Sequence, residues 1–173
     1  VKQPIFDEIS FTSQDSILIA KEQGYLSLAT KGGDRFYSLS GRFEEVLGIS
    51  EDYVGIKLDD KYGFVDLQGR LRVANRYDSI RLFSDDMAAF YLLGNWGYID
   101  KEEKLRVQPV YESSFDFING TAIVIENGKY GVIDKDGTYL LDSKYDYISR
   151  NGFGSFHIEF EGKYGLYNSE VKK

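Results

Sequence analysis

Lys61-Tyr62-Gly63-Phe64-Val65-Asp66 is the stretch of sequence that decides the fold, because it returns at a fixed distance. The related hexapeptides are Asn95-Trp96-Gly97-Tyr98-Ile99-Asp100, Lys129-Tyr130-Gly131-Val132-Ile133-Asp134 and Lys163-Tyr164-Gly165-Leu166-Tyr167-Asn168. Successive glycines in these four copies are 34 residues apart, and Gln23-Gly24-Tyr25-Leu26-Ser27 is a weaker fifth copy. A fixed period of this length indicates a repeat protein, in which neighbouring repeats share one core.

A second marker, an aromatic residue followed by an acid, keeps the same step. Its copies are Phe43-Glu44, Tyr77-Asp78, Tyr111-Glu112 and Tyr145-Asp146, while Phe6-Asp7 lies 37 residues before Phe43. We place the three extra residues in the loop around Gly32-Gly33-Asp34. The sequence therefore predicts a single repeat domain over 1–173, with repeats at roughly 1–40, 41–74, 75–108, 109–142 and 143–173.

The composition favours an all-β fold of short strands joined by tight turns. The chain has 14 Tyr, 12 Phe and 18 Gly but only 2 Pro, and aromatic residues favour strands while glycine favours turns. Each repeat is expected to contain three short antiparallel strands and little helix. The strands expected ahead of the Tyr/Trp-Gly strands are Ser16–Ala20, Tyr53–Leu58, Met87–Leu93, Thr121–Glu126 and Ser155–Phe160.

Two overall arrangements of these five tandem repeats remain open. Three strands are few for a propeller blade, which usually has four, so an open, twisted or superhelical array is favoured. A closed five-repeat, propeller-like ring is the second choice, with Lys2–Phe6 completing the fifth repeat. In either arrangement the aromatic-glycine pairs are expected to be a structural ladder, formed by Tyr62-Gly63, Trp96-Gly97, Tyr130-Gly131 and Tyr164-Gly165.

The repeat resembles the bacterial WG-repeat family. The third interval carries the resemblance best, with Gly120-Thr121-Ala122-Ile123-Val124, then Gly128-Lys129-Tyr130-Gly131-Val132-Ile133-Asp134, Gly137 and Tyr145-Asp146. Trp96-Gly97 is a literal WG pair, whereas three copies have Tyr in place of Trp. The resemblance spans essentially the whole chain and is weakest before Gly24-Tyr25. It implies an interaction module, often exported or associated with the cell envelope. It implies no catalytic residues.

Charge and residue types exclude several classes of function. The formal net charge is −7, which repels nucleic acids and anionic lipid, so no nucleic-acid partner is expected. No apolar run approaches the roughly 20 residues of a transmembrane helix, so membrane insertion is not expected either. A basic protein would be attracted. The chain has no Cys and a single His, His157, so no metal, cofactor or catalytic residue is expected. The sequence starts at Val1 rather than Met, so a signal, a lipoprotein anchor or a neighbouring domain ahead of it stays open. Localisation is open as well, with the cell envelope or export favoured slightly over the cytoplasm.

The residues that break the repeat are the better functional candidates, because recognition in a repeat array falls on positions that are free to differ. Met87–Leu93 is apolar on both faces of its strand, so either a second layer covers it or it forms an exposed patch. The candidate partner-binding residues are Ala89, Tyr91, Leu93, Phe115, Phe117, Tyr147 and Phe153.

These observations predict a non-enzymatic binding module that contacts another protein through an aromatic and acidic face, including an inhibitor or immunity-like role. A glycan- or cell-wall-binding module is the alternative, and solvent-facing ladder rings would favour it. An enzyme of the glycosidase type ranks third, because it would need two carboxylates close together in one cleft.

Overall fold

The computed structural model describes residues 8–11, 17–22, 25–30, 36–38, 42–152 and 154–168. These residues form strands and turns and contain no helix, which confirms the predicted all-β class. The chain divides into two compact parts, an N-terminal half (Val1–Leu82) and a C-terminal half (Phe83–Lys173), and each is described by itself. The prediction of a single repeat domain stays a prediction.

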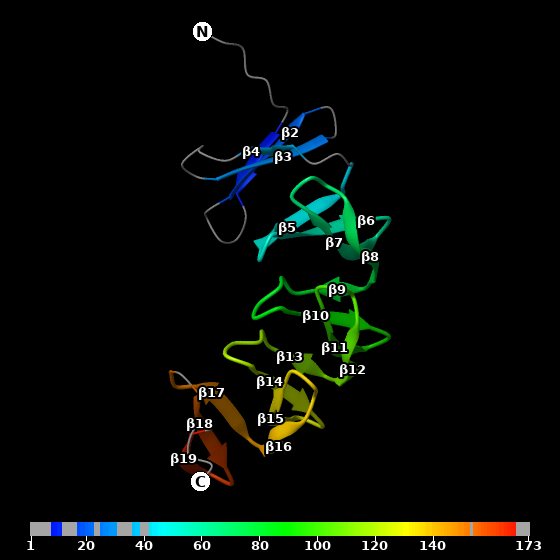
Figure 1. The fold of residues 1–173 in the computed structure, drawn as a ribbon. Helices are drawn as coiled ribbons and strands as arrows, with labels where there is room; N and C mark the ends of the chain where they lie inside the picture. Colours follow the sequence, from blue (N-terminus) through cyan, green and yellow to red (C-terminus); the bar gives the residue numbers. More distant parts are fainter. Residues whose placement is uncertain are drawn as a thin grey trace. The chain divides into compact units, whose positions relative to one another are not determined.

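The strands follow the repeat in both halves (Figure 1). Those of the N-terminal half are β1 (Glu8–Phe11), β2 (Ile17–Glu22), β3 (Tyr25–Thr30), β4 (Phe36–Ser38), β5 (Glu45–Ser50), β6 (Tyr53–Leu58), β7 (Lys61–Asp66), β8 (Leu71–Tyr77) and β9 (Ser79–Ile80). Those of the C-terminal half are β10 (Met87–Leu92), β11 (Asn95–Asp100), β12 (Leu105–Tyr111), β13 (Ser113–Ser114), β14 (Thr121–Glu126), β15 (Lys129–Asp134), β16 (Tyr139–Tyr145), β17 (Tyr147–Arg150), β18 (Ser155–Phe160) and β19 (Lys163–Asn168).

Each sheet is an antiparallel meander, in which every strand pairs with the strands next to it in sequence. The orders are β1-β2-β3-β4, β5-β6-β7-β8, β13-β14-β15-β16 and β17-β18-β19, and β10, β11 and β12 pair in the same way. A closed propeller ring needs a strand from one end of the chain to join the sheet at the other end. No such crossover occurs within the described ranges. The ring-closing role considered for Lys2–Phe6 falls outside the described residues.

The prediction of three strands per repeat is wrong for most of the described sheets, which have four strands, whereas β17-β18-β19 has three. The aromatic-acid marker is not one strand: Tyr111 ends β12, Glu112 lies at a bend, and Ser113 starts β13. The carboxylate of Glu112 then accepts a hydrogen bond of 3.0 Å from the Gly128 N–H, in the turn between β14 and β15. The marker therefore ends one sheet, begins the next and fixes a hairpin turn of that next sheet.

The repeated glycine allows the fourth strand of a sheet to cross its neighbour closely. A Cβ atom on Gly97 would lie 2.6 Å from the Val107 carbonyl oxygen and 2.8 Å from the Pro109 nitrogen. The pairing of β11 with β12 also shifts register here, so the strands come closest where only glycine fits. This close approach of two backbones lies within one sheet rather than between repeats.

A tight turn follows the Tyr/Trp-Gly strand at Asp66 and at Asp134, where Gly69 and Gly137 donate backbone hydrogen bonds to the Asp carbonyls. Asp66 Oδ1 accepts hydrogen bonds of 3.0 Å from the N–H groups of both Gln68 and Arg70. Burial alone would raise the pKa of Asp66, but these bonds and those from the Arg70 and Arg72 side chains lower it to about 2. Gly69 follows at a φ of 80°, a conformation that favours glycine.

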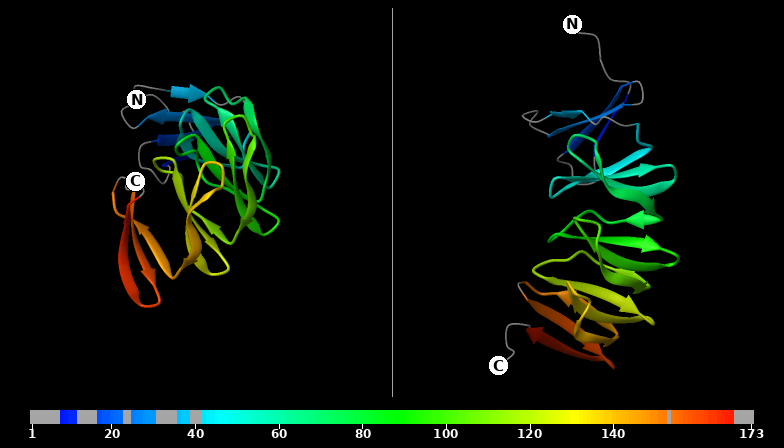
Figure 2. Two further views of the ribbon diagram at one scale, coloured as in Figure 1. Left: turned by 60° about the horizontal axis from the view of Figure 1, so that its bottom comes forward. Right: turned by 45° about the vertical axis from the view of Figure 1, so that its right-hand side comes forward.

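The core of the C-terminal half lies between successive sheets, which stack face to face (Figure 2). Side chains alternate along β14, so Ala122 and Val124 face one cluster while Ile123 faces another. The first cluster consists of Met87, Ala89, Tyr98, Val107, Tyr111, Phe117, Ala122, Val124 and Ile133. The second consists of Ile123, Val132, Leu141, Ile148 and Phe156. A strand between two sheets is thus buried on both faces.

Candidate functional site

Two of the candidate partner-binding residues lie in the core. Ala89 is 3% exposed and packs with Met87, while Phe117 is 1% exposed and packs edge to face on Tyr98, with ring centroids 4.8 Å apart. Within Met87–Leu93, residues 87–90 are covered, and the face that holds Ala89 packs on a neighbouring sheet of the C-terminal half. Burial removes both residues from the surface that a partner can touch.

Tyr91 and Leu93 lie at the far end of the same hairpin. Tyr91 is half-buried beside Trp96, with ring centroids 5.3 Å apart. Leu93 lies just beyond β10, in the turn, with a φ of 52° and 88% of its surface exposed. It therefore forms an exposed apolar tip of the turn rather than part of a strand face. Phe153, also a candidate partner-binding residue, lies outside the described residues.

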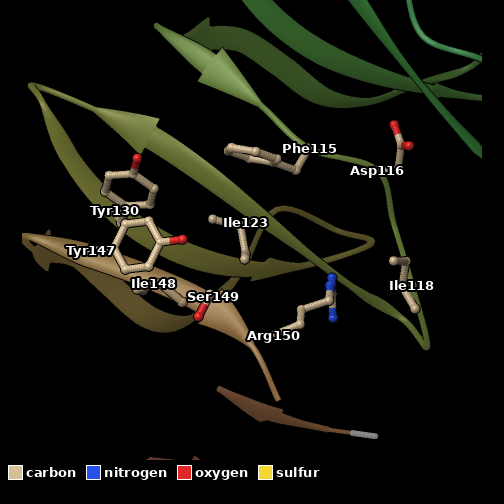
Figure 3. A pocket seen from close by; sticks show the side chains of 9 residues that line it. All are labelled: Phe115, Asp116, Ile118, Ile123, Tyr130, Tyr147, Ile148, Ser149 and Arg150. Carbon is tan, nitrogen blue, oxygen red and sulfur yellow. The ribbon is translucent and has the colours of Figure 1, made fainter. Parts of the chain in front are cut away.

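Phe115 and Tyr147 come together at one pocket of about 330 Å³. Phe115 is 41% exposed and follows β13, whereas Tyr147 is 50% exposed and begins β17. The complete lining is Phe115, Asp116, Ile118, Ile123, Tyr130, Tyr147, Ile148, Ser149 and Arg150 (Figure 3). We call this site the Phe115–Tyr147 pocket.

The loop that carries Phe115 is fixed by the sheet before it. Tyr98 donates a hydrogen bond of 2.7 Å from its hydroxyl to the Phe115 carbonyl, and Ser84 Oγ donates one of 2.7 Å to the Phe117 carbonyl. The Asp85 carboxylate accepts a hydrogen bond from the Gly120 N–H. Because Phe117 points into the core while Phe115 stays exposed, the loop presents one ring outward from a rigid base.

Arg150 forms one side of the pocket and has neutral hydrogen-bond partners. Its Nη1 donates to Thr121 Oγ1 at 2.9 Å, and its Nη2 donates to the Thr121 carbonyl. Its guanidinium carbon lies 5.3 Å from the centre of the Phe156 ring, a cation–π contact. Burial lowers the pKa of Arg150, because a low-dielectric surrounding disfavours the charged form.

Sequence reasoning did not single out Arg150, although the repeat contains a signal for it. The equivalent positions in the three preceding repeats, at steps of 34 residues, hold Asp116, Leu82 and Gly48. Arg150 therefore places a long cationic side chain where the other repeats have an acidic or an apolar residue. Ile118 was also missed, and it is 44% exposed at the pocket edge.

The ladder rings are not equally placed. Tyr62, Trp96 and Tyr130 are half-buried, whereas Tyr164 on β19 is 82% exposed. Tyr130 also packs edge to face on Tyr147, with ring centroids 5.4 Å apart. Most of the ladder thus belongs to the packing of the sheets, and Tyr164 alone of the four presents an open ring.

The single histidine lies away from the Phe115–Tyr147 pocket lining. The side chain of His157 is exposed on β18, which pairs it with Ser149. Over the ranges that the structure describes, no group of three or more His, Cys, Asp or Glu residues is arranged to hold a metal ion. The same ranges contain no helix long and apolar enough to cross a membrane.

Solved structures share the fold at low sequence identity, and they are β-propeller or β-repeat proteins. A eukaryotic initiation factor aligns with a TM-score of 0.57 and 10% identity, covering 99% of this chain and 53% of that one. Hsv2p of Kluyveromyces lactis aligns with a TM-score of 0.51 and 8% identity, covering 97% of this chain and 63% of that one. The chain spans less than two thirds of either structure, so the likeness concerns the fold alone. No curated protein matches the chain in sequence.

The sequence profile of the WG containing repeat matches three consecutive segments, at 62–95, 96–130 and 130–154. Together they extend from 62 to 154, which is 93 of the 173 residues. The matched segments contain the Trp/Tyr-Gly strands β11 and β15, whose glycines receive the crossing strand of each sheet. The chain therefore belongs to the WG-containing repeat family.

Proposed function

We propose that this chain is a non-enzymatic protein-binding module and that the Phe115–Tyr147 pocket is its contact surface. The observation that carries the proposal is the meeting of two exposed rings at one apolar pocket of about 330 Å³. Exposed aromatic side chains around a pocket are the usual anchors of protein interfaces. The repeat fold supports a binding role, because repeat proteins often use their variable positions for recognition.

Both rings stand at positions where the other repeats lack an aromatic residue. The residues equivalent to Phe115 in the repeats before and after it are Arg81 and Ser149. The residues equivalent to Tyr147 in the two preceding repeats are Ser113 and Ser79. Neither ring is required to build a sheet, since the sheets with small or charged residues at these positions are also formed. The two rings are therefore additions to the scaffold, as the proposed binding role requires.

The positions of the repeated acids support a non-enzymatic role. Asp66 and Asp134 accept backbone hydrogen bonds within their own turns, and Glu112 accepts one from Gly128. Asp146 is paired with Lys129 at 2.5 Å and accepts a hydrogen bond from the Glu161 N–H. Each of these carboxylates has a structural task that recurs with the repeat, which leaves none of them as a specialised catalytic acid.

The half-buried ladder rings give little support to glycan binding. A sugar-binding row needs open faces on several rings, and Tyr62, Trp96 and Tyr130 are packed within the sheets. Tyr164 has an open ring and provides a matched control for Tyr147, because the two residues are chemically identical and both exposed.

The proposal is tested by affinity capture from a lysate of the source organism, comparing the wild-type chain with Tyr147→Ser and Tyr164→Ser. We expect Tyr147→Ser to capture the specific partner in about tenfold lower amount than the wild type, because the variant lacks an interface anchor. Tyr164→Ser should retain it. Far-ultraviolet circular dichroism verifies that both variants are folded. Equal capture by both variants would refute a contact surface at this pocket.

A further inference from the structure

Arg150 is a partly buried cation with no carboxylate partner in the described part of the chain. Both of its hydrogen bonds go to uncharged oxygens of Thr121. Asp85 attracts it electrostatically but is itself paired with Lys135 at 3.0 Å and bonded to the Gly120 N–H. A desolvated guanidinium gains more from an incoming anion than an exposed one does, because the attraction is less screened.

The Asp116 carboxylate lines the same pocket but does not neutralise Arg150. Figure 3 shows it directed away from the guanidinium and from the other lining side chains. The side chains on the Arg150 side of the pocket are otherwise neutral: Ile118, Ile148 and Ser149. An anion entering here would meet one positive charge and an apolar wall.

The opposite end of the pocket is aromatic. Tyr130 and Tyr147 pack edge to face there, and Phe115 lies across from them (Figure 3). Tyr147 and Arg150 belong to the same strand, three residues apart, so their Cα atoms are about 10 Å from each other. The pocket thus offers an apolar end and a cationic end at a fixed spacing.

We propose that this pocket binds a peptide segment of the partner protein that carries one large apolar side chain and one carboxylate two residues further along. In an extended peptide these two side chains lie on the same face with Cα atoms about 7 Å apart. The reach of the acidic side chain supplies the remaining distance to Arg150, while the apolar side chain lies among the three rings. This inference rests on the proposed function and names the chemistry of its ligand.

The net charge of −7 restricts the ligand further. A run of acidic residues would be repelled by the chain as a whole, whereas one carboxylate beside neutral or basic residues would not. The specificity is therefore local, with Arg150 as its determinant, and it is compatible with a partner that is basic overall.

Two matched peptides test the inference: acetyl-Phe-Ser-Glu-amide and acetyl-Phe-Ser-Gln-amide, titrated into the whole chain and followed by amide NMR. We expect both to shift the signals of 115–118 and 147–150, with the Glu peptide binding about tenfold more tightly, as a charge-assisted bond implies. Arg150→Gln should remove this difference while keeping the weaker apolar binding. Thr121→Val is the control, because it removes one acceptor of Arg150 but leaves the charge; it should keep the difference.

The outcomes separate this inference from the proposed function. Equal affinities of the two peptides for the wild type would overturn the role of Arg150, even if Tyr147→Ser still loses the captured protein. Failure of both peptides to shift these signals at millimolar concentration would overturn the proposed ligand. Loss of discrimination in Thr121→Val as well as in Arg150→Gln would make Arg150 a structural residue. If Tyr147→Ser captures as well as the wild type, the proposed function itself fails.

Discussion

Replacing Gly97 by Ala should destabilise the C-terminal half, whereas the same change at Gly165 should not. The two glycines occupy the same position of the repeat, but β12 crosses over Gly97, while β19 is the last strand of its three-stranded sheet. A Cβ atom on Gly97 would lie 2.6 Å from the Val107 carbonyl oxygen and 2.9 Å from Phe90 Cζ. On Gly165 it would lie 3.2 Å and 3.4 Å from atoms of the flexible Ile158 side chain.

The expected magnitudes follow from these distances. An overpacked methyl group that must displace backbone costs about 1–3 kcal/mol, and Val107 O can retreat only if β12 moves by nearly an ångström. At Gly165 the loss of unfolded-state freedom favours Ala by roughly 0.4–1 kcal/mol, which offsets the slight crowding. Gly97→Ala should therefore be less stable than Gly165→Ala by about 2–3 kcal/mol.

Urea denaturation followed by circular dichroism measures the difference, and Trp96 fluorescence reports on the C-terminal half. The control is the wild-type slope of the free energy of unfolding against urea, which should be unchanged in both variants. Equal stability of Gly97→Ala and Gly165→Ala would refute the idea that the repeated glycine exists to admit the crossing strand.

Three further predictions concern individual residues. The pKa of Asp66 is lowered to about 2 in the folded chain, so its ionised carboxylate stabilises the fold by an amount on the order of 2 kcal/mol. This stabilisation is complete above about pH 4 and is lost as the pH falls toward 2. Asp66→Asn should abolish that part of the acid dependence in urea titrations, and an unchanged dependence would contradict it. Tyr98→Phe should cost about 1–2 kcal/mol and raise hydrogen exchange in the loop that follows Phe115, because that carbonyl loses its donor; unchanged exchange would argue against an anchored loop. Leu93→Asn should stabilise the chain by about 1 kcal/mol, because Leu93 has a φ of 52° that Asn adopts more readily, as Asn127 does in the next hairpin. Thermal melting tests this, and a loss of stability would show that Leu93 makes a contact that matters.

Much of the fold could be predicted because the repeat fixes local structure. The strands Tyr53–Leu58 and Thr121–Glu126 agree with β6 and β14 residue for residue, since strand period and turn residues are local properties. The fourth strand was missed because nothing in the sequence alone separates Tyr111 from Ser113. The bend at Glu112 arises only when each side pairs with a different sheet.

The site could be predicted only in part, for a related reason. Repeat-breaking rings indicated Phe115 and Tyr147, which the structure leaves exposed at one pocket. The same reasoning selected Ala89 and Phe117, which are buried, because alternation along a strand defines its faces but not whether another sheet covers them. Arg150 also breaks the repeat, but its significance depends on Phe156 of the paired strand β18 and on Thr121 of the preceding sheet. The sequence alone does not reveal either contact.

We propose that recognition lies at the residues that break the repeat and not at the repeated scaffold. Site-specific photo-crosslinking tests it most directly, with a photoreactive phenylalanine analogue placed at position 115 or at position 71, where Leu71 is comparably exposed. We expect a crosslinked partner from position 115 that Arg150→Gln weakens, and none from position 71. Equal crosslinking from both positions, or crosslinking from position 71 alone, would contradict it.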